Sequence, residues 1–232
     1  LVLCTGTYQG ATIDIDLTLQ GRYGSAVTIL TGGGDALALS SNPSLELDDL
    51  TVANAGLAGI QGTGDVTLTD SVVHSCGAGG IDVVGDVTLT NSEVRDNTGD
   101  FGGIRVENGT LSLTNTSVHD NVGTVGGGGI SLDSARVDCF GTSPILDNEA
   151  PEGGGVLSTR STIDGCTIES NTASLTGGGV RTEGSGVGSG SSILSSTLVA
   201  NEVLGVNTGG GLSAAAATVL TDTAVTGNTA AF

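Results

Sequence analysis

The sequence lacks lysine, tryptophan and methionine, and its 232 residues include only three prolines and 2% aromatic residues. All six basic residues are arginines, against 25 acidic residues, so the net charge is −19. This charge argues against nucleic acid as a partner, because phosphates need cationic contacts, and against binding to anionic membranes. No apolar run approaches the roughly 18 residues of a membrane-spanning helix, so direct membrane insertion is not expected.

Glycine is abundant, with 41 residues, and it recurs in clusters rather than at every third position, which excludes collagen. Three segments show the repeat most clearly: an Asp-Asn pair, a short variable stretch, a glycine cluster and a β-branched residue. They are D-N-T-G-D-F-G-G-I (96–104), D-N-V-G-T-V-G-G-G-G-I (120–130) and D-N-E-A-P-E-G-G-G-V (147–156). Weaker copies on both sides, at spacings of 21 to 30 residues, indicate a solenoid that fills residues 1–232 as one domain.

Each repeat contains three short apolar stretches that alternate with polar residues, as in V-T-L at 87–89 and L-S-L at 111–113. Period-two alternation predicts strands, and glycines interrupt every window of helical length. The fold class is therefore all-β, a parallel β-helix with three short strands per coil and roughly eight to ten coils. At about 4.8 Å per coil, such a rod is on the order of 40 Å long.

One asparagine per coil occupies the same phase, and we interpret this column as a structural ladder at a coil corner. Asparagine tolerates left-handed turns and hydrogen-bonds neighbouring backbone, whereas glycine permits positive φ and close backbone approach at another corner. The alternative is metal ligation by the same amides. The column comprises Asn97, Asn121, Asn148, Asn171, Asn201 and Asn228.

Four cysteines form no zinc motif. Cys139 and Cys166 lie on consecutive coils, in different phases relative to the asparagine, and their positions permit a disulfide. Cys4 and Cys76 are too many coils apart to pair easily. We interpret these two as small buried hydrophobic residues, with Cys76 at the asparagine position of its coil.

The densest set of ionisable residues on one face lies just before the asparagine column: His74, Arg95, Asp96, His119 and Asp120. It is either a binding or proton-transfer patch or a solvated ladder of alternating charge. Histidines two coils apart are too distant for one metal ligand sphere, which favours the ladder.

Two further expectations concern acidic side chains. Asp82 and Arg105 follow equivalent isoleucines on neighbouring coils, which predicts a surface ion pair. Asp14, Asp16, Asp48 and Asp49 are the candidates for Ca²⁺, although no tandem calcium-binding nonapeptide is present; no other cofactor is expected.

The opening run C-T-G-T-Y (4–8), I-D-I-D-L-T-L-Q-G (13–21) and A-V-T-I-L-T-G-G-G (26–34) resembles the first coils of bacterial secreted right-handed β-helix proteins of the pectate-lyase-like superfamily. The G-G-G-I and D-N repeats resemble polymorphic outer-membrane-protein-like surface proteins. The resemblance covers essentially the whole chain. It implies a right-handed helix, an extracellular or bacterial cell-surface location, and a longer precursor with a capping segment before Leu1.

Enzymes of that superfamily degrade acidic polysaccharides, through a calcium-carboxylate cluster with a basic residue or through clustered aspartates. This chain has no lysine, no G-H-G and no N-T-D motif. The leading hypothesis is a structural or adhesive rod without catalysis that stacks end to end into filaments or binds a host or matrix ligand. The alternatives are a carbohydrate-active enzyme, either polysaccharide lyase or glycoside hydrolase, and a calcium-dependent glycan-binding module.

Overall fold

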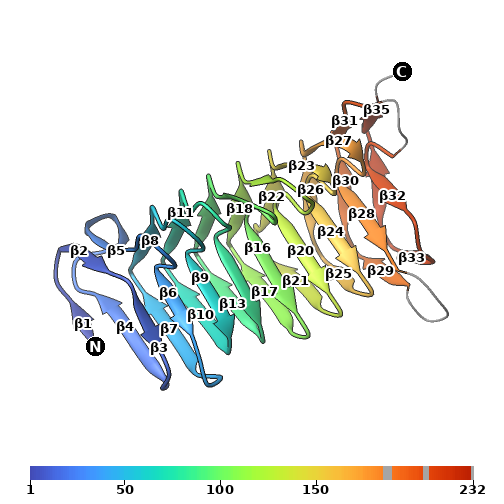
Figure 1. The fold of residues 1–232 in the computed structure, drawn as a ribbon. Coiled ribbons are helices and arrows are strands. Elements are labelled where there is room, and N and C mark those ends of the chain that lie inside the picture. Colours follow the sequence, from blue (N-terminus) through green and yellow to red (C-terminus); the bar gives the residue numbers. More distant parts are fainter. Residues whose placement is uncertain (185–189, 206–208, 231–232) are drawn as a thin grey trace.

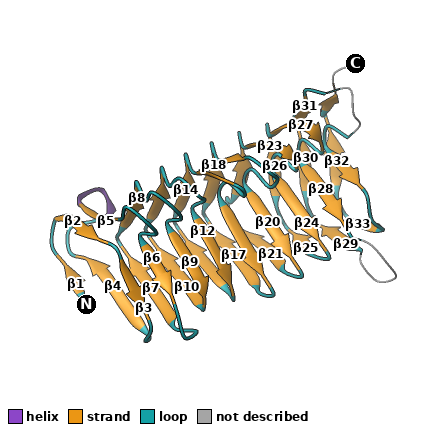
Figure 2. Ribbon diagram, in the orientation of Figure 1, coloured by secondary structure: helices purple, strands orange, loops and turns teal. Residues whose placement is uncertain are grey.

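The protein is a straight rod of stacked coils, seen in a computed structural model that describes residues 1–184, 190–205 and 209–230 (Figure 1). Successive turns of the chain lie side by side from the N-terminus to the C-terminus, and strands dominate each turn (Figure 2). The strands form three long parallel sheets and a fourth, narrower one. One short 3₁₀ helix, η1 (Ser25–Val27), interrupts the second coil. Within the described ranges no helix could cross a membrane.

Each sheet takes one strand from each coil that contributes to it, and strand order follows chain order. Sheet 1 comprises β1 (Val2–Leu3), β4 (Leu17–Gly21), β7 (Ser44–Asp48), β10 (Asp65–Thr69), β13 (Val87–Thr90), β17 (Thr110–Thr114), β21 (Arg136–Phe140), β25 (Thr162–Asp164), β29 (Ser191–Leu194) and β33 (Thr218–Thr221). Sheet 2 comprises β2 (Gly6–Gln9), β5 (Thr28–Thr31), β8 (Thr51–Ala53), β11 (Val72–His74), β14 (Glu93–Arg95), β18 (Ser117–His119), β22 (Pro144–Leu146), β26 (Thr167–Glu169), β30 (Thr197–Val199) and β34 (Ala224–Thr226).

The two remaining sheets complete the coil. Sheet 3 comprises β3 (Ala11–Ile13), β6 (Leu37–Leu39), β9 (Ile60–Thr63), β12 (Ile81–Val84), β16 (Ile104–Glu107), β20 (Ile130–Asp133), β24 (Val156–Thr159), β28 (Val180–Glu183) and β32 (Leu212–Ala214). Sheet 4 comprises β15 (Thr98–Gly99), β19 (Val122–Gly123), β23 (Glu149–Glu152), β27 (Thr172–Thr176), β31 (Glu202–Val203) and β35 (Thr229–Ala230).

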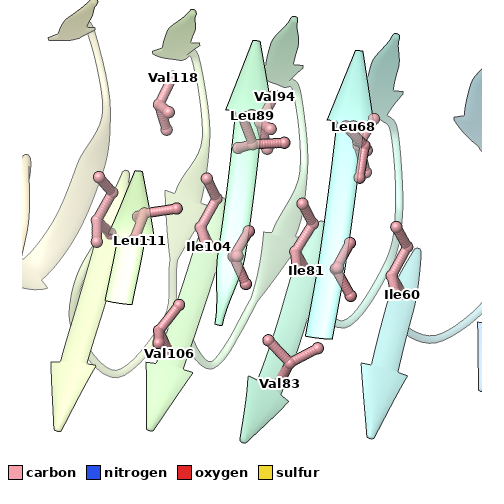
Figure 3. Packing of buried hydrophobic residues seen from close by; sticks show 14 of the residues in the cluster. Ile60, Leu68, Ile81, Val83, Leu89, Val94, Ile104, Val106, Leu111 and Val118 are labelled. Carbon is pink, nitrogen blue, oxygen red and sulfur yellow. The ribbon is translucent and has the colours of Figure 1, made fainter. Parts of the chain in front are cut away.

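The core is a set of apolar columns that run along the rod, because parallel register places like residues over like residues. Ile60, Ile81 and Ile104 are paired on consecutive strands of sheet 3 and are fully buried (Figure 3). Leu68 and Leu89 form the matching column in sheet 1. Burying one such side chain contributes about 1.5–3 kcal/mol, so each coil is stabilised mainly by its neighbours. The predicted parallel β-helix is confirmed.

Sheet 4 was not predicted. Its strands lie in the stretch after the asparagine, which the sequence pattern treats as a variable loop, and most are two residues long. Most of their inward positions are occupied by small buried residues, namely Gly99, Gly123, Ala150 and Ala173, whereas β31 places Val203 inside. Glycine and alanine give no apolar alternation, so the sequence carries no strand signal there although the backbone pairs from coil to coil.

The asparagine column forms a continuous ladder inside the rod. The backbone N–H and Nδ2 of Asn97 both donate to Oδ1 of Asn121, at 3.1 and 3.0 Å, and Asn121 repeats the pattern toward Asn148. The same pair of bonds links Asn148 to Asn171, Asn171 to Asn201 and Asn201 to Asn228. Each oxygen accepts two N–H groups, so these amides satisfy buried backbone groups, which supports the structural interpretation.

The expectation that these asparagines adopt the left-handed turn is wrong. The positive φ lies one residue earlier, at Asp96 (54°), Asp120 (53°) and Asp147 (52°). The aspartate takes the tight turn at the surface, and the turn points the asparagine inward, where its side chain joins the ladder. The Asp-Asn pair therefore divides two tasks between neighbouring residues.

Glycine was predicted to permit positive φ and close backbone approach, and different glycines of each cluster serve these two roles. In the cluster 127–129, Gly127 has a φ of 62°, whereas Gly128 and Gly129 are closely packed. A Cβ on Gly128 would lie 2.4 Å from the carbonyl oxygen of Gly154, and a Cβ on Gly129 would lie 2.8 Å from Nδ2 of Asn148. The triplets 153–155, 177–179 and 209–211 share this arrangement. The third glycine of each triplet makes room for the asparagine ladder.

Three of the four cysteines lie as the sequence predicts, and Cys4 does not. Cys139 and Cys166 form a disulfide between neighbouring coils, with Cα atoms 5.0 Å apart. Cys76 is buried at the asparagine position of its coil. It has no side-chain amide to extend the ladder, but its backbone N–H donates to Asn97 Oδ1. Cys4 is exposed, so its interpretation as a buried hydrophobic residue is wrong.

Removing the disulfide is expected to destabilise the rod. For a bridge that closes a loop of 27 residues, the variant Cys139→Ser should lower the free energy of unfolding by about 3 kcal/mol. Urea unfolding followed by circular dichroism measures this difference. Cys4→Ser is the matched control and should leave the curve unchanged; identical curves for both variants would show that the bridge contributes nothing.

Candidate functional site

A ladder of charged side chains lies on the outer face of sheet 2. Parallel register pairs His74 with Arg95 and Arg95 with His119, so the three residues predicted to share a face do so, and all three are half-buried. Asp96 and Asp120 flank them at the turns. The predicted alternation of charge along the rod axis is wrong, because the three basic residues stack directly on one another and the carboxylates lie beside this column.

His119 is held by two carboxylates from different coils. Its Nε2 lies 2.7 Å from Glu93 Oε1 and its Nδ1 lies 2.6 Å from Asp120 Oδ2. Partial burial alone would lower the pKa of His119, but the hydrogen bonds to Asp120 and Glu93 together outweigh it, and the pKa is raised. Arg95 contacts Glu93 and Asp96 in the same network.

His74 experiences the opposite environment. Partial burial, and then the positive charge of Arg95, lower its pKa below the ordinary value of 6.5. Its Nδ1 lies 2.9 Å from the hydroxyl oxygen of Ser75 rather than near a carboxylate. The two histidines therefore differ in charge at a pH between their pKa values.

A proton NMR titration of the only two histidines tests this network. We expect the ring of His119 to titrate above pH 6.5 and that of His74 below it. Because the raised pKa belongs to the folded state, the stabilisation from His119 is fully present below its unfolded pKa and is lost as the pH rises through the folded pKa. Relative to His119→Gln, the native protein should thus gain stability toward acid pH. Equal titration midpoints for the two rings would contradict the assignment.

A hollow of about 440 Å³ lies beside sheet 3, at its border with the turns that carry sheet 4. Its centre is Arg105 on β16, whose guanidinium lies 4.9 Å from the ring centroid of Phe101. Arg105 Nη1 lies 3.0 Å from Asp82 Oδ1, which confirms the predicted ion pair, and the guanidinium also contacts Glu107. Gln61, Gly77, Ala78 and Asp100 complete the lining.

The sequence pattern did not place Asp100 and Phe101 in this site. Both belong to the variable stretch of their coil, so no periodicity marks them. The one available signal was composition: Phe101 is one of three phenylalanines and stands directly before a glycine pair. The hollow presents carboxylates, an amide, a guanidinium and one aromatic ring, which is chemistry suited to hydroxyl-rich or cationic ligands.

Two of the four aspartates considered for calcium form hydrogen bonds to neighbouring coils. Asp16 Oδ1 accepts the N–H of Ser44 at 2.8 Å, and Asp48 Oδ2 accepts Nε2 of Gln20 at 2.7 Å. In the part of the chain that the structure describes, no group of three or more His, Cys, Asp or Glu side chains is placed to hold a metal ion.

The fold and these ladders define a class of protein, the parallel β-helices. A family model described as "Right handed beta helix region" matches residues 19–156, and the chain belongs to this family. No curated protein and no solved structure gives a significant match. The family match is consistent with the pectate-lyase-like superfamily that the opening coils resemble.

Proposed function

We propose that this β-helix is a non-catalytic structural or adhesive rod, located outside the cell or on a bacterial cell surface. A disulfide between coils suits an oxidising compartment, and a net charge of −19 favours solubility. The resemblance of the D-N and G-G-G-I repeats to surface proteins supports the location.

The observation that carries the proposal is how the chain uses its arginines. Arg136 bonds Asp164 on the next coil at 2.5 Å, and Arg160 bonds Asp133 on the preceding coil at 2.6 Å. Arg105 and Arg181 similarly contact carboxylates one coil away. A single surface pair contributes little, but together with the asparagine ladder these pairs connect successive coils along the rod. Four of the six arginines thus join neighbouring coils, which supports a structural use of these scarce cations.

End-to-end stacking is the second part of the proposal. Leu220 and Val225 continue the buried columns of Ile193 and Leu198, yet they are 46% and 42% exposed. A coil in the same register would cover them, and we propose that a second copy supplies it by strand addition. Negative-stain microscopy at several protein concentrations tests this; short rods at every concentration would remove the filament.

A carbohydrate-active enzyme is the second candidate, favoured by the hollow that contains Asp82, Asp100 and Phe101. Acidic and neutral glycans should be screened for new unsaturated or reducing ends. Under the scaffold proposal no glycan is cleaved, whereas cleavage that is lost in Asp100→Asn would establish the enzyme.

For a calcium-dependent glycan-binding module, a melting temperature that falls on chelation is the expected sign.

A further inference from the structure

One corner of the rod exposes apolar side chains along most of its length. This corner consists of the turns that lead from sheet 2 to sheet 3, along the upper edge marked by β23, β27 and β31 in Figure 1. Within the described residues, five large hydrophobic side chains of these turns are exposed by 38–56%. Together with the half-buried Phe101 they form what we term the corner ridge: Leu57, Phe101, Val122, Val125, Leu175 and Leu204.

The turns that carry the ridge residues stack on one another, although the turns of Ala78 and Ala150 add no large exposed apolar side chain. Ala78 N–H donates to the carbonyl of Leu57, Val125 N–H to that of Asp100, and Leu204 N–H to that of Ala173. From the coil of Leu57 to that of Leu204 the ridge spans six coil spacings, or about 29 Å. That length matches a helix of about 20 residues. Scattered exposed apolar residues are ordinary, but a row of them along one edge marks an interaction surface.

The charge on the same turns identifies the kind of partner. From the turn of Leu57 to that of Leu204, these turns contain seven acidic residues and no arginine. Four exposed carboxylates, those of Asp100, Asp147, Glu149 and Glu202, form no ion pair within the described part of the chain. A partner that covers the ridge must therefore bring its own cations, since burying unpaired carboxylates is costly.

A second copy of this chain is poorly suited to supply those cations. It has no lysine, and five of its six arginines are already in ion pairs: Arg95, Arg105, Arg136, Arg160 and Arg181. Arg22, whose guanidinium lies 5.7 Å from the ring centroid of Tyr23, is in no ion pair within the described residues. Two acidic rods would also repel each other at this edge.

We propose that the corner ridge docks a basic amphipathic segment of another protein, with apolar side chains on the ridge and Lys or Arg side chains beside its carboxylates. This inference names a partner for the rod-shaped scaffold and rests on that proposed function. Phe101 and Val125 lie on adjacent coils near the hollow around Arg105, which gives the segment a recess at mid-ridge.

The probe is a fluorescent 20-residue peptide of Lys and Leu arranged as an amphipathic helix, with a second peptide that carries Ser in place of Leu. At physiological salt the Leu peptide should bind to the native protein. The double variant Val125→Asn, Leu175→Asn should bind this peptide about tenfold more weakly, because two apolar contacts are lost. The double variant Glu149→Gln, Glu202→Gln should also bind the Leu peptide more weakly, and its binding should depend less on salt concentration.

The matched control is Tyr23→Asn, Phe140→Asn, which removes exposed apolar side chains away from the ridge and should leave the Kd within about twofold. Equal binding of the Ser peptide, or an equal loss in the control, would overturn the ridge as the docking site. Unchanged melting temperatures verify that the variants fold. Glycan cleavage would instead refute the scaffold, whatever the peptide does, so the two failures are distinguishable.

Discussion

Replacing Asn121 with alanine is expected to lower the free energy of unfolding by about 3 to 5 kcal/mol. Asn121 Nδ2 donates to the carbonyl oxygens of Val94 and His119 and lies 3.0 Å from Asn148 Oδ1. Its Oδ1 accepts two bonds from Asn97. Alanine leaves several of these buried groups without a partner, and each unsatisfied group costs about 1–3 kcal/mol. Urea unfolding followed by circular dichroism measures the loss.

Asn108→Gly is the matched control for that experiment. Asn108 is exposed, and its φ of 54° is a conformation that glycine adopts without strain. We expect its unfolding free energy to change by less than about 0.5 kcal/mol. If Asn121→Ala were as mild as this control, the ladder would contribute no net stability and the structural interpretation of the column would fail.

The variant Gly128→Ala should be nearly as damaging, with a loss of about 3 kcal/mol. The added Cβ would lie 2.4 Å from the carbonyl oxygen of Gly154 and 2.5 Å from that of Glu149. Both contacts are backbone atoms, which cannot move aside without breaking the stacking of coils. The melting temperature, with urea unfolding, reports the effect.

Gly33→Ala is the control, because it tests whether any Gly-to-Ala substitution destabilises the protein or only one at a closely packed glycine. A Cβ at Gly33 would meet nothing within 4 Å, so the change should be neutral or stabilise by about 0.4–1 kcal/mol through the unfolded state. Comparable destabilisation in both variants would contradict the packing role assigned to the glycine triplets.

The sequence predicted the repeats, the apolar columns and the asparagine phase because each depends on periodicity. Val94 and Val118, for example, stand three residues before Asn97 and Asn121, and the structure pairs them. The same periodicity fixes the register of the strands, so the sequence alone places His74, Arg95 and His119 on one face.

Features of the turns could not be predicted in the same way. Most strands of sheet 4 have glycine or alanine inside, so apolar alternation is absent from them. The left-handed residue of the Asp-Asn pair depends on which side chain the core can accept, and a buried amide that completes a ladder is favoured over a buried carboxylate. The hollow around Arg105 and the corner ridge arise because turns of different length stack, which brings Phe101 and Val125 to one edge although nothing in their spacing marks them.

Hydrogen exchange of side-chain amides tests the central claim most directly, since the ladder exists only if successive coils stack in register. In NMR spectra, the Nδ2 protons of Asn121, Asn148 and Asn171 should exchange only when their coils unfold, roughly a thousandfold or more slowly than those of exposed Asn42 and Asn108. Exchange of all five side chains at the same rate would place the asparagines in solvent and contradict the account.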